Sequence, residues 1–172
     1  MTFIINVVVM KHLNLRSQFG LLCVLLILAA CQRANDAFNA EVEKSWVEKA
    51  INDCIGWAKD KNIQQLYGVI ANDSNYLEVD PEDRVVKGFQ EFRKSEKGWM
   101  NPDFKAIRYD IKDLKIDFSK SGDVAWFYCM LNDINEWKGQ PACWENTRWT
   151  GVLEKRNNNW IIVQMHFSFA SK

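Results

Sequence analysis

Residues 104–169 alternate between apolar and polar side chains almost without interruption, in runs separated by turn-forming residues. Alternation with a period of two is typical of strands that bury one face of a sheet. The turn signals lie at residues 119–123, 135–142 and 156–159, the last of them rich in asparagine. We therefore expect the second half of the chain to form a four-stranded antiparallel meander, whose buried face must be covered by the first half.

The first of these runs, residues 104–118, contains an irregularity. Its apolar residues change from odd to even positions between Ile111 and Leu114. One extra residue in a strand restores the pattern on the same face, so we expect a β-bulge near Lys112–Asp113.

The segment before the predicted sheet has helical periodicity. Between Phe38 and about Lys61, apolar side chains recur every three or four residues, at Val42, Trp46, Ala50, Cys54 and Trp57, and the stripe is widened by Val47, Ile51 and Ala58. A shorter helix is expected from Asn62, a short strand at Tyr76–Val79, and a third helix over residues 85–100. Helices followed by strands predict an α+β fold class.

Residues 1–30 have the pattern of a bacterial lipoprotein signal peptide. Basic residues precede the apolar run Phe19–Leu28, which is short for a membrane span. The sequence Leu28-Ala29-Ala30-Cys31 resembles a lipobox, so Cys31 is the expected lipidation site, with either Met1 or Met10 as the start. We expect residues 1–30 to be removed, residues 31–37 to form a tether and residues 38–172 to form the domain.

The residue after Cys31 and the charge of the chain restrict location and partners. Gln32, instead of an aspartate, follows Cys31, which by resemblance to sorting rules indicates the periplasmic face of the outer membrane in a bacterial cell envelope. The chain has 22 basic and 22 acidic residues and no basic stripe, which argues against a nucleic-acid partner. The membrane is expected as a partner through the lipid anchor alone.

Cysteine usage leaves the disulfide pattern open. Cys54, Cys129 and Cys143 follow Cys31, an odd number in an oxidising compartment, so one disulfide and one buried thiol are expected. Cys54 with Cys143 is one pairing, whereas Cys129 and Cys143 would be out of register on paired strands. The sequence has no CxxC and no ligand spacing for zinc, so no metal and no cofactor are expected.

The segment "TRWTGVLEKRNNNWIIVQMHFSFA" resembles the C-terminal hairpin of the SnoaL-like group of the nuclear transport factor 2-like superfamily. The matching residues are Arg148, Thr150, Val152, Lys155, Trp160, Ile162, Val163, His166 and Ser168. "GDVAWFYC" resembles the preceding strand and "VKGFQEF" the third helix, so the resemblance covers about residues 38–170. It implies a cone-shaped fold, with N-terminal helices packed on a curved antiparallel sheet and a pocket at the open end.

Within that cone, alternation assigns the candidate site. We expect the concave side of the last strand to carry Trp160, Ile162, Gln164, His166 and Ser168, and the outer side to carry Ile161, Val163, Met165, Phe167 and Phe169. The predicted ligand-binding residues are Trp46, Trp126, Tyr128, Arg148, Gln164 and His166.

His166 would be the only histidine in residues 31–172. It has three interpretations: a structural residue bonded within the sheet, a ligand contact, or a catalytic acid–base group. Arg148 either binds an anionic ligand group or forms an internal ion pair with Asp73 or Asp133.

The favoured function is binding of a small, partly apolar molecule in the pocket. An isomerase, dehydratase or hydrolase that uses His166 as acid–base is the alternative, and a non-catalytic protein-interaction module is a third reading. The sequence has no phosphate-binding loop and no Ser/His/Asp arrangement. Because the outer face would expose many large apolar groups, we also expect a homodimer formed through it.

Overall fold

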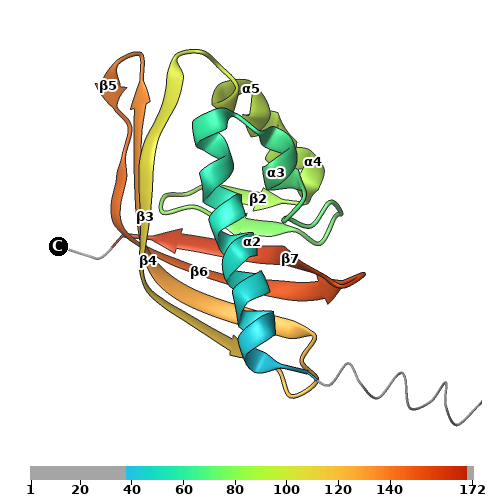
Figure 1. The fold of residues 1–172 in the computed structure, drawn as a ribbon. Helices are drawn as coiled ribbons and strands as arrows, with labels where there is room; N and C mark the ends of the chain where they lie inside the picture. The colour runs from blue at the N-terminus through green and yellow to red at the C-terminus, as the bar shows by residue number, and fades with distance from the viewer. Residues whose placement is uncertain (1–37, 170–172) are drawn as a thin grey trace, which may run out of the picture. The chain divides into compact units, whose positions relative to one another are not determined.

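The computed structural model describes residues 38–169, in which helices precede a curved sheet (Figure 1). This order confirms the predicted α+β class. The elements are α2 (Ala40–Asp60), α3 (Ile63–Tyr67), β1 (Leu77–Val79), β2 (Val85–Lys87), α4 (Phe89–Phe92), the 3-10 turn η1 (Arg93–Ser95), α5 (Glu96–Trp99), β3 (Phe104–Phe118), β4 (Val124–Trp137), β5 (Gln140–Pro141), β6 (Trp144–Arg156) and β7 (Asn159–Ser168).

Helix α2 begins and ends with regular caps. The side chain of Asn39 accepts hydrogen bonds from the amides of Glu41 and Val42, and Lys61 ends the helix with a left-handed backbone (φ 52°). The buried stripe consists of Val47, Ala50, Ile51, Cys54 and Trp57. All five belong to the predicted stripe, whereas two of its other members, Val42 and Trp46, lie on the exposed side of the helix.

The sheet contains the predicted meander and one addition. Its strand order is β2-β1-β7-β6-β4-β3, with β5 paired to β4. The long strands β3, β4, β6 and β7 are antiparallel neighbours, as expected. Strand β1 adds to β7 in parallel, so the sheet is mixed and not purely antiparallel. Helix α2 lies across its concave side and packs against β3 and β7 (Figure 1).

Residues 85–100 do not form one helix. Val85–Lys87 pair with β1 as strand β2, and Gly88 then turns the chain with a positive φ of 81°. Glycine adopts this backbone conformation without the steric cost that a Cβ brings. The amide of Gly88 donates to the carbonyl of Tyr76 at 2.7 Å, and the short helices follow. Phe89 and Phe92 face the core, as predicted.

Of the four register shifts between the long strands, two bear on the predicted faces of the strands. In β3 the register shifts between Lys112 and Lys115, and Asp113 has a φ of 54°, so the predicted bulge is confirmed. In β7 a second shift was not predicted. Leu153 pairs with Ile162 and Val152 with Gln164, which leaves Val163 as the extra residue.

The β7 bulge changes the predicted faces of that strand. Trp160 and Ile162 are buried before the bulge, and Met165 and Phe167 are buried after it. Gln164 and His166 therefore point to the convex side, opposite to the expectation from strict alternation.

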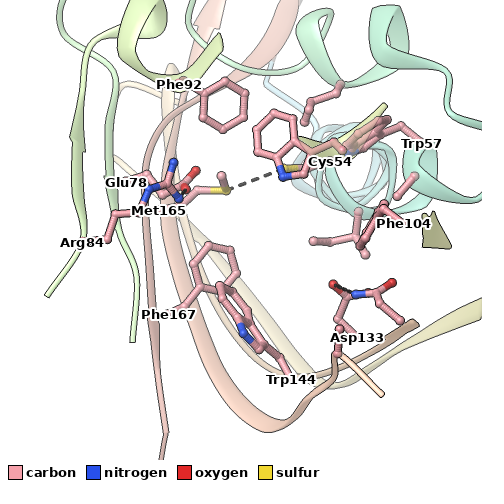
Figure 2. Close-up of a pocket in the computed structure, with 16 residues that line it drawn as sticks. Cys54, Trp57, Glu78, Arg84, Phe92, Phe104, Asp133, Trp144, Met165 and Phe167 are labelled. Carbon is pink, nitrogen blue, oxygen red and sulfur yellow. Dashed lines mark hydrogen bonds and ion pairs between the residues drawn. The ribbon is translucent and has the colours of Figure 1, made fainter. Parts of the chain in front are cut away.

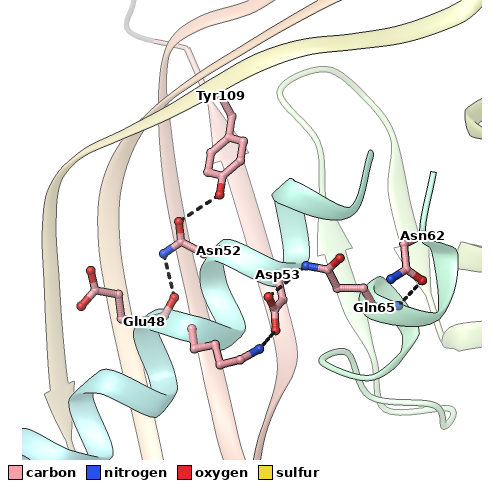
Figure 3. A network of polar contacts seen from close by, with 7 residues as sticks. Glu48, Asn52, Asp53, Asn62, Gln65 and Tyr109 are labelled. Carbon is pink, nitrogen blue, oxygen red and sulfur yellow. Dashed lines mark hydrogen bonds and ion pairs between the residues drawn. The ribbon is translucent and has the colours of Figure 1, made fainter. Parts of the chain in front are cut away.

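Polar contacts hold α2 to its neighbours (Figure 3). The Tyr109 hydroxyl of β3 donates to Asn52 Oδ1 at 3.2 Å, and Gln65 Nε2 of α3 donates to Asp53 Oδ1 at 2.9 Å. Asp53 also pairs with Lys49 one turn earlier. These contacts fix the C-terminal half of α2, whose buried face forms one wall of the cavity described next.

Candidate functional site

A cavity of about 280 Å³ lies between the C-terminal half of α2, the α4–α5 segment and the concave side of the sheet (Figure 2). Most of its wall is apolar, and its aromatic members are Trp57, Phe92, Trp99, Phe104, Trp144 and Phe167. The volume is slightly below the roughly 300–1,000 Å³ of typical ligand pockets. The cavity therefore suits a small molecule.

The aromatic side chains of the wall brace one another. Trp99 contacts Trp57 edge-on with a centroid distance of 5.7 Å and contacts Phe92 at 4.9 Å. On the sheet side, Trp144 and Phe167 lie 5.2 Å apart. Tilted and edge-on contacts of this kind are favourable and restrict ring motion. The wall is therefore largely preformed.

One end of the cavity carries a buried carboxyl group, Glu78 of β1. Its Oε2 accepts a hydrogen bond from the Tyr76 hydroxyl at 2.7 Å, and Oε1 lies 3.6 Å from Arg84 Nη1. Arg84 contacts Asp80 more closely, at 2.6 Å, and donates to Ser95 Oγ at 2.7 Å.

The pKa of Glu78 is raised to about 7. Burial is the main cause and the nearby Asp80 carboxylate adds to it, whereas the hydrogen bond from Tyr76 and the charge of Arg84 lower the pKa. A carboxyl group in this range exchanges its proton near neutral pH. Glu78 therefore has the chemistry of an acid–base group.

A second polar group occupies another part of the wall, away from Glu78 (Figure 2). Asn135 Nδ2 donates to Asp133 Oδ2 at 2.8 Å, and burial raises the pKa of Asp133. Asn135 is only 6 % exposed, and its Oδ1 has no hydrogen-bond partner among residues 38–169. A buried acceptor without a donor is costly, so this oxygen is ready to accept one from a ligand.

The cysteines do not form the expected disulfide. Cys54, Cys129 and Cys143 are all free thiols. Cys54 lines the cavity, and its thiol donates to Met165 Sδ at 3.6 Å. Burial raises the pKa of Cys54 and raises that of Cys129 to about 12. Both are therefore neutral thiols that contribute to packing and not to nucleophilic chemistry.

The ligand-binding residues predicted from the sequence do not line this cavity. Trp126, Tyr128, Arg148, Gln164 and His166 do lie together, because their strands are neighbours, but on the convex face. Trp126 is 46 % exposed there. The expected concave position of this group is wrong because of the β7 bulge and because β4 and β6 bury the opposite residues. Trp46 lies apart from it, on the exposed side of α2.

Among residues 38–169, neither Arg148 nor His166 lies beside an acidic partner. The Arg148 guanidinium donates to the Phe169 carbonyl instead of pairing with Asp73 or Asp133. Asp73 pairs with Arg156 at 2.6 Å. His166 is exposed, and within the part of the chain that the structure describes its imidazole makes no hydrogen bond. The titratable carboxyl groups that line the cavity are Glu78 and Asp133, whereas His166 lies outside it.

Sequence reasoning missed Glu78 and Asn135 as cavity residues and named Asp133 only as a partner for other side chains, not as part of the cavity wall. A signal for two of them exists in β4, where Asp133 and Asn135 have the same parity as the buried Phe127 and Leu131. Polar residues at inward positions indicate a cavity or a partner. Glu78 has a weaker signal, since its strand is only three residues long.

The structure adds two negative findings for residues 38–169. No group of three or more His, Cys, Asp or Glu side chains in this range is arranged to hold a metal ion. No helix in the same range is long and apolar enough to cross a membrane. Cys31 and the predicted signal peptide lie outside the described residues.

Comparisons with known proteins agree with the fold. A dehydratase, provisionally assigned, of the nuclear transport factor 2-like family from Streptomyces avermitilis has a TM-score of 0.66 and 16% identity, covering 78% of this chain and 100% of its own. A nuclear transport factor 2-like protein from Cytophaga hutchinsonii has a TM-score of 0.60 and 10% identity, covering 74% of this chain and 98% of its own. At such identities the likeness establishes the cone-shaped fold alone.

The sequence itself gives the family. No curated protein matches the chain. The family model described as SnoaL-like domain matches residues 47–172, which include most of α2 and all of the sheet. The chain therefore belongs to the SnoaL-like domain family.

Proposed function

We propose that this domain binds a small, largely apolar molecule in the cavity between α2 and the concave side of the sheet. The observation that carries the proposal is an aromatic wall with a few polar groups, including the unpartnered Asn135 Oδ1. Ligand pockets have this composition, with apolar area for affinity and a few polar atoms for orientation. The convex residues predicted from the sequence are not needed for it.

The experiment is to fill the cavity. Ala58 and Ala142 both line it, so Ala58→Trp and Ala142→Trp each place an indole in the space. The neutral probe 2-phenylethanol should raise the Tm of the wild-type chain in a concentration-dependent manner, because it binds only the folded state. Both variants should lose this shift while keeping the wild-type far-UV circular dichroism.

Trp126→Ala is the matched control, since it changes an exposed aromatic side chain outside the cavity. It should keep the wild-type response to 2-phenylethanol. A shift that persists in both cavity-filling variants, or that disappears in Trp126→Ala, would place the binding site outside the cavity and refute the proposal.

Acid–base catalysis in the same cavity is the second candidate function. The observation that favours it is the Glu78 carboxyl group, with its pKa near 7 and its hydrogen bond from Tyr76. Glu78 would remove a proton from carbon next to a carbonyl group and return one from solvent, which is the elementary step of an isomerase or a dehydratase. Deuterium incorporation into phenylacetone in D₂O, followed by NMR, should then be faster with the wild type than with Glu78→Gln. Equal rates would remove Glu78 as the base.

We further propose that Cys31 is lipidated and anchors the domain in a bacterial cell envelope. Support comes from Leu28-Ala29-Ala30-Cys31 and the preceding apolar run. One anchored diacylglycerol with its acyl chains contributes roughly 0.8 kcal/mol of membrane binding per buried methylene group. The wild type should incorporate labelled palmitate in a bacterial host and Cys31→Ala should not. Label in both proteins would exclude Cys31 as the site.

A further inference from the structure

We propose that the cavity selects a ligand with a cationic amine, held between Asp133 and Asn135, and an aromatic or aliphatic body against the surrounding rings. This deepens the proposed binding function and rests on it. It names the chemical class of the ligand from the polar atoms that the cavity offers and from the charges that it lacks.

The Asp133–Asn135 pair offers two free oxygen acceptors to the cavity. One N–H of the Asn135 amide is donated to Asp133 Oδ2, at 2.8 Å. Two acceptors remain, Asn135 Oδ1 and Asp133 Oδ1. Within residues 38–169, the bond from Asn135 to Oδ2 is the only side-chain hydrogen bond of Asp133. Two neighbouring acceptors, one of them a carboxyl oxygen, are complementary to a group with several N–H donors.

The charges along the wall disfavour an anion. Glu78 and Asp133 both line the cavity, and Arg84 is the one cation among its described lining residues. Arg84 is already bound, by Asp80 at 2.6 Å and by Ser95 at 2.7 Å, with Glu78 also nearby. An anionic ligand would therefore meet two carboxyl groups and no available cation. An ammonium group would instead meet the Asp133 carboxyl group, which has an oxygen free to accept hydrogen bonds.

The aromatic wall also accepts a cation. Rings attract ammonium groups within about 6 Å of their centroids. Lys61 already shows this at the wall, because its Nζ lies 5.2 Å from the centroid of Phe104. That Nζ also donates to the carbonyls of Trp99 and Asn101, at 2.7 and 2.9 Å. The Lys61 ammonium group is thus already bound to backbone carbonyls and is not available to a ligand carboxylate.

Glu78 is less suited than Asp133 to hold the ammonium group. Tyr76 occupies one of its oxygens at 2.7 Å, and Arg84 lies 3.6 Å from the other. The groups that face Glu78 are therefore Tyr76, Arg84, the Asp80 carboxylate and the Cys54 thiol. Among residues 38–169, the one side-chain hydrogen-bond partner of Asp133 is the neutral Asn135 amide. We accordingly place the amine at Asp133 and assign Glu78 to the opposite end of the ligand.

The test compares three probes of equal shape on the full-length chain by titration calorimetry: 2-phenylethylamine, 2-phenylethanol and phenylacetate. The amine should bind about tenfold more tightly than the alcohol, the range expected for a hydrogen bond to a charged group. Phenylacetate should bind more weakly than either. Asp133→Asn should reduce the affinity for the amine to that for the alcohol, whereas the matched variant Asp117→Asn, at an exposed position of β3, should keep the tenfold preference.

A second measurement uses the wild type alone, in case Asp133→Asn does not fold. An ammonium group beside the buried Asp133 favours its ionised form, so amine binding should release protons to the buffer over the pH range in which Asp133 titrates. The binding enthalpy of the amine should then vary with the ionisation enthalpy of the buffer, and that of the alcohol should not.

The outcomes separate the two proposals. If none of the three probes binds, the proposed cavity function fails. If 2-phenylethanol or phenylacetate binds as tightly as the amine, the cavity function stands and amine selectivity is refuted. If the preference is lost in Glu78→Gln but kept in Asp133→Asn, the amine does not lie at Asp133 and the placement is refuted.

Discussion

The two faces of one sheet differ sharply, although they are built from alternate residues of the same strands. On the concave face, Trp149 is fully buried, stacks on Phe167 at 5.4 Å and meets Phe127 edge-on at 5.0 Å. On the convex face, Trp126 and Tyr128 are 46 % and 36 % exposed. The same residue types therefore form a closely packed core layer on one side of the sheet and an accessible surface on the other.

This difference shows that aromatic content alone does not identify a binding site. The concave rings are fixed by several neighbours, and changes there must alter packing throughout the core. The convex rings have few constraints, so changes there act mainly on whatever contacts that surface. Substitutions on the concave face should therefore change stability more than substitutions on the convex face.

The largest effect is expected at Gly151 of β6. A Cβ at this position would lie 2.5 Å from Phe127 Cε1 and 2.8 Å from the Gln164 carbonyl oxygen. Neither atom has room to move, since Phe127 packs on Trp149 and the carbonyl belongs to the neighbouring strand. Gly151→Ala should lower the free energy of unfolding by about 4 kcal/mol, above the usual range for overpacking because a strand must shift. Urea denaturation measures it.

Gly98→Ala is the matched control, because a Cβ at Gly98 would meet no atom within 4 Å. Its free energy of unfolding should stay within about 0.5 kcal/mol of the wild-type value. A similar small change for Gly151→Ala would show that the concave face is loosely packed, and the contrast between the faces would lose its basis.

The second effect concerns the carboxyl group on the concave side. The pKa of Glu78 is raised from 4.5 to about 7, so the folded chain holds this proton more tightly than the unfolded chain does. The resulting stabilisation is complete below about pH 4 and is lost as the pH rises through 7. The raised pKa of Asp133 acts in the same direction, whereas the lowered pKa values of Glu43 and Asp73 act in the opposite one.

The contribution of Glu78 is isolated by comparing wild type with Glu78→Gln in urea denaturation between pH 4 and pH 8. Between pH 4 and pH 8, the free energy of unfolding of the wild type should fall by about 3 kcal/mol more than that of Glu78→Gln. Asp117→Asn, on the convex side, should follow the wild type. Parallel curves for wild type and Glu78→Gln would mean that the Glu78 proton is held no more tightly in the folded chain.

The two bulges show why the faces of one strand could be predicted from the sequence and those of another could not. The β3 bulge was predictable because polar residues mark one side of that strand, so a change of parity at Ile111 and Leu114 is visible. In β7 both parities are apolar around Val163, so an inserted residue leaves no mark in the pattern. The sequence therefore predicts the strands and the fold, but not which side His166 faces.

The cavity was less predictable than the strands for a related reason. Its two carboxyl groups come from β1 and β4, which are brought together by pairing across the sheet and not by local periodicity. Glu78 lies beside Met165 only because β1 joins β7 in parallel, far away in the sequence. Local alternation predicts that a residue points inward. It does not predict a cavity, because a cavity forms where the inward side chains of distant segments leave space between them.

The smallest effect on stability is expected on the convex face, where we propose the homodimer contact. The sequence-based prediction placed Met165 and Phe167 in this contact, and both are buried instead. Trp126 and Tyr128 are the exposed aromatic residues of β4 on that face. Trp126→Arg should change the free energy of unfolding by no more than about 0.5 kcal/mol at a concentration where the chain is monomeric.

The same substitution should have a clear effect on association. A stable dimer buries roughly 800 Å² per partner, and a charged side chain at its centre opposes that burial. Size-exclusion chromatography with light scattering should give a dimer for the full-length wild type and a monomer for Trp126→Arg. Trp46→Arg is the matched control, since Trp46 is also an exposed tryptophan but lies on helix α2, and this variant should remain a dimer. A monomeric wild type, or loss of the dimer in Trp46→Arg alone, would place any self-association outside the convex face and leave its aromatic residues as ordinary surface.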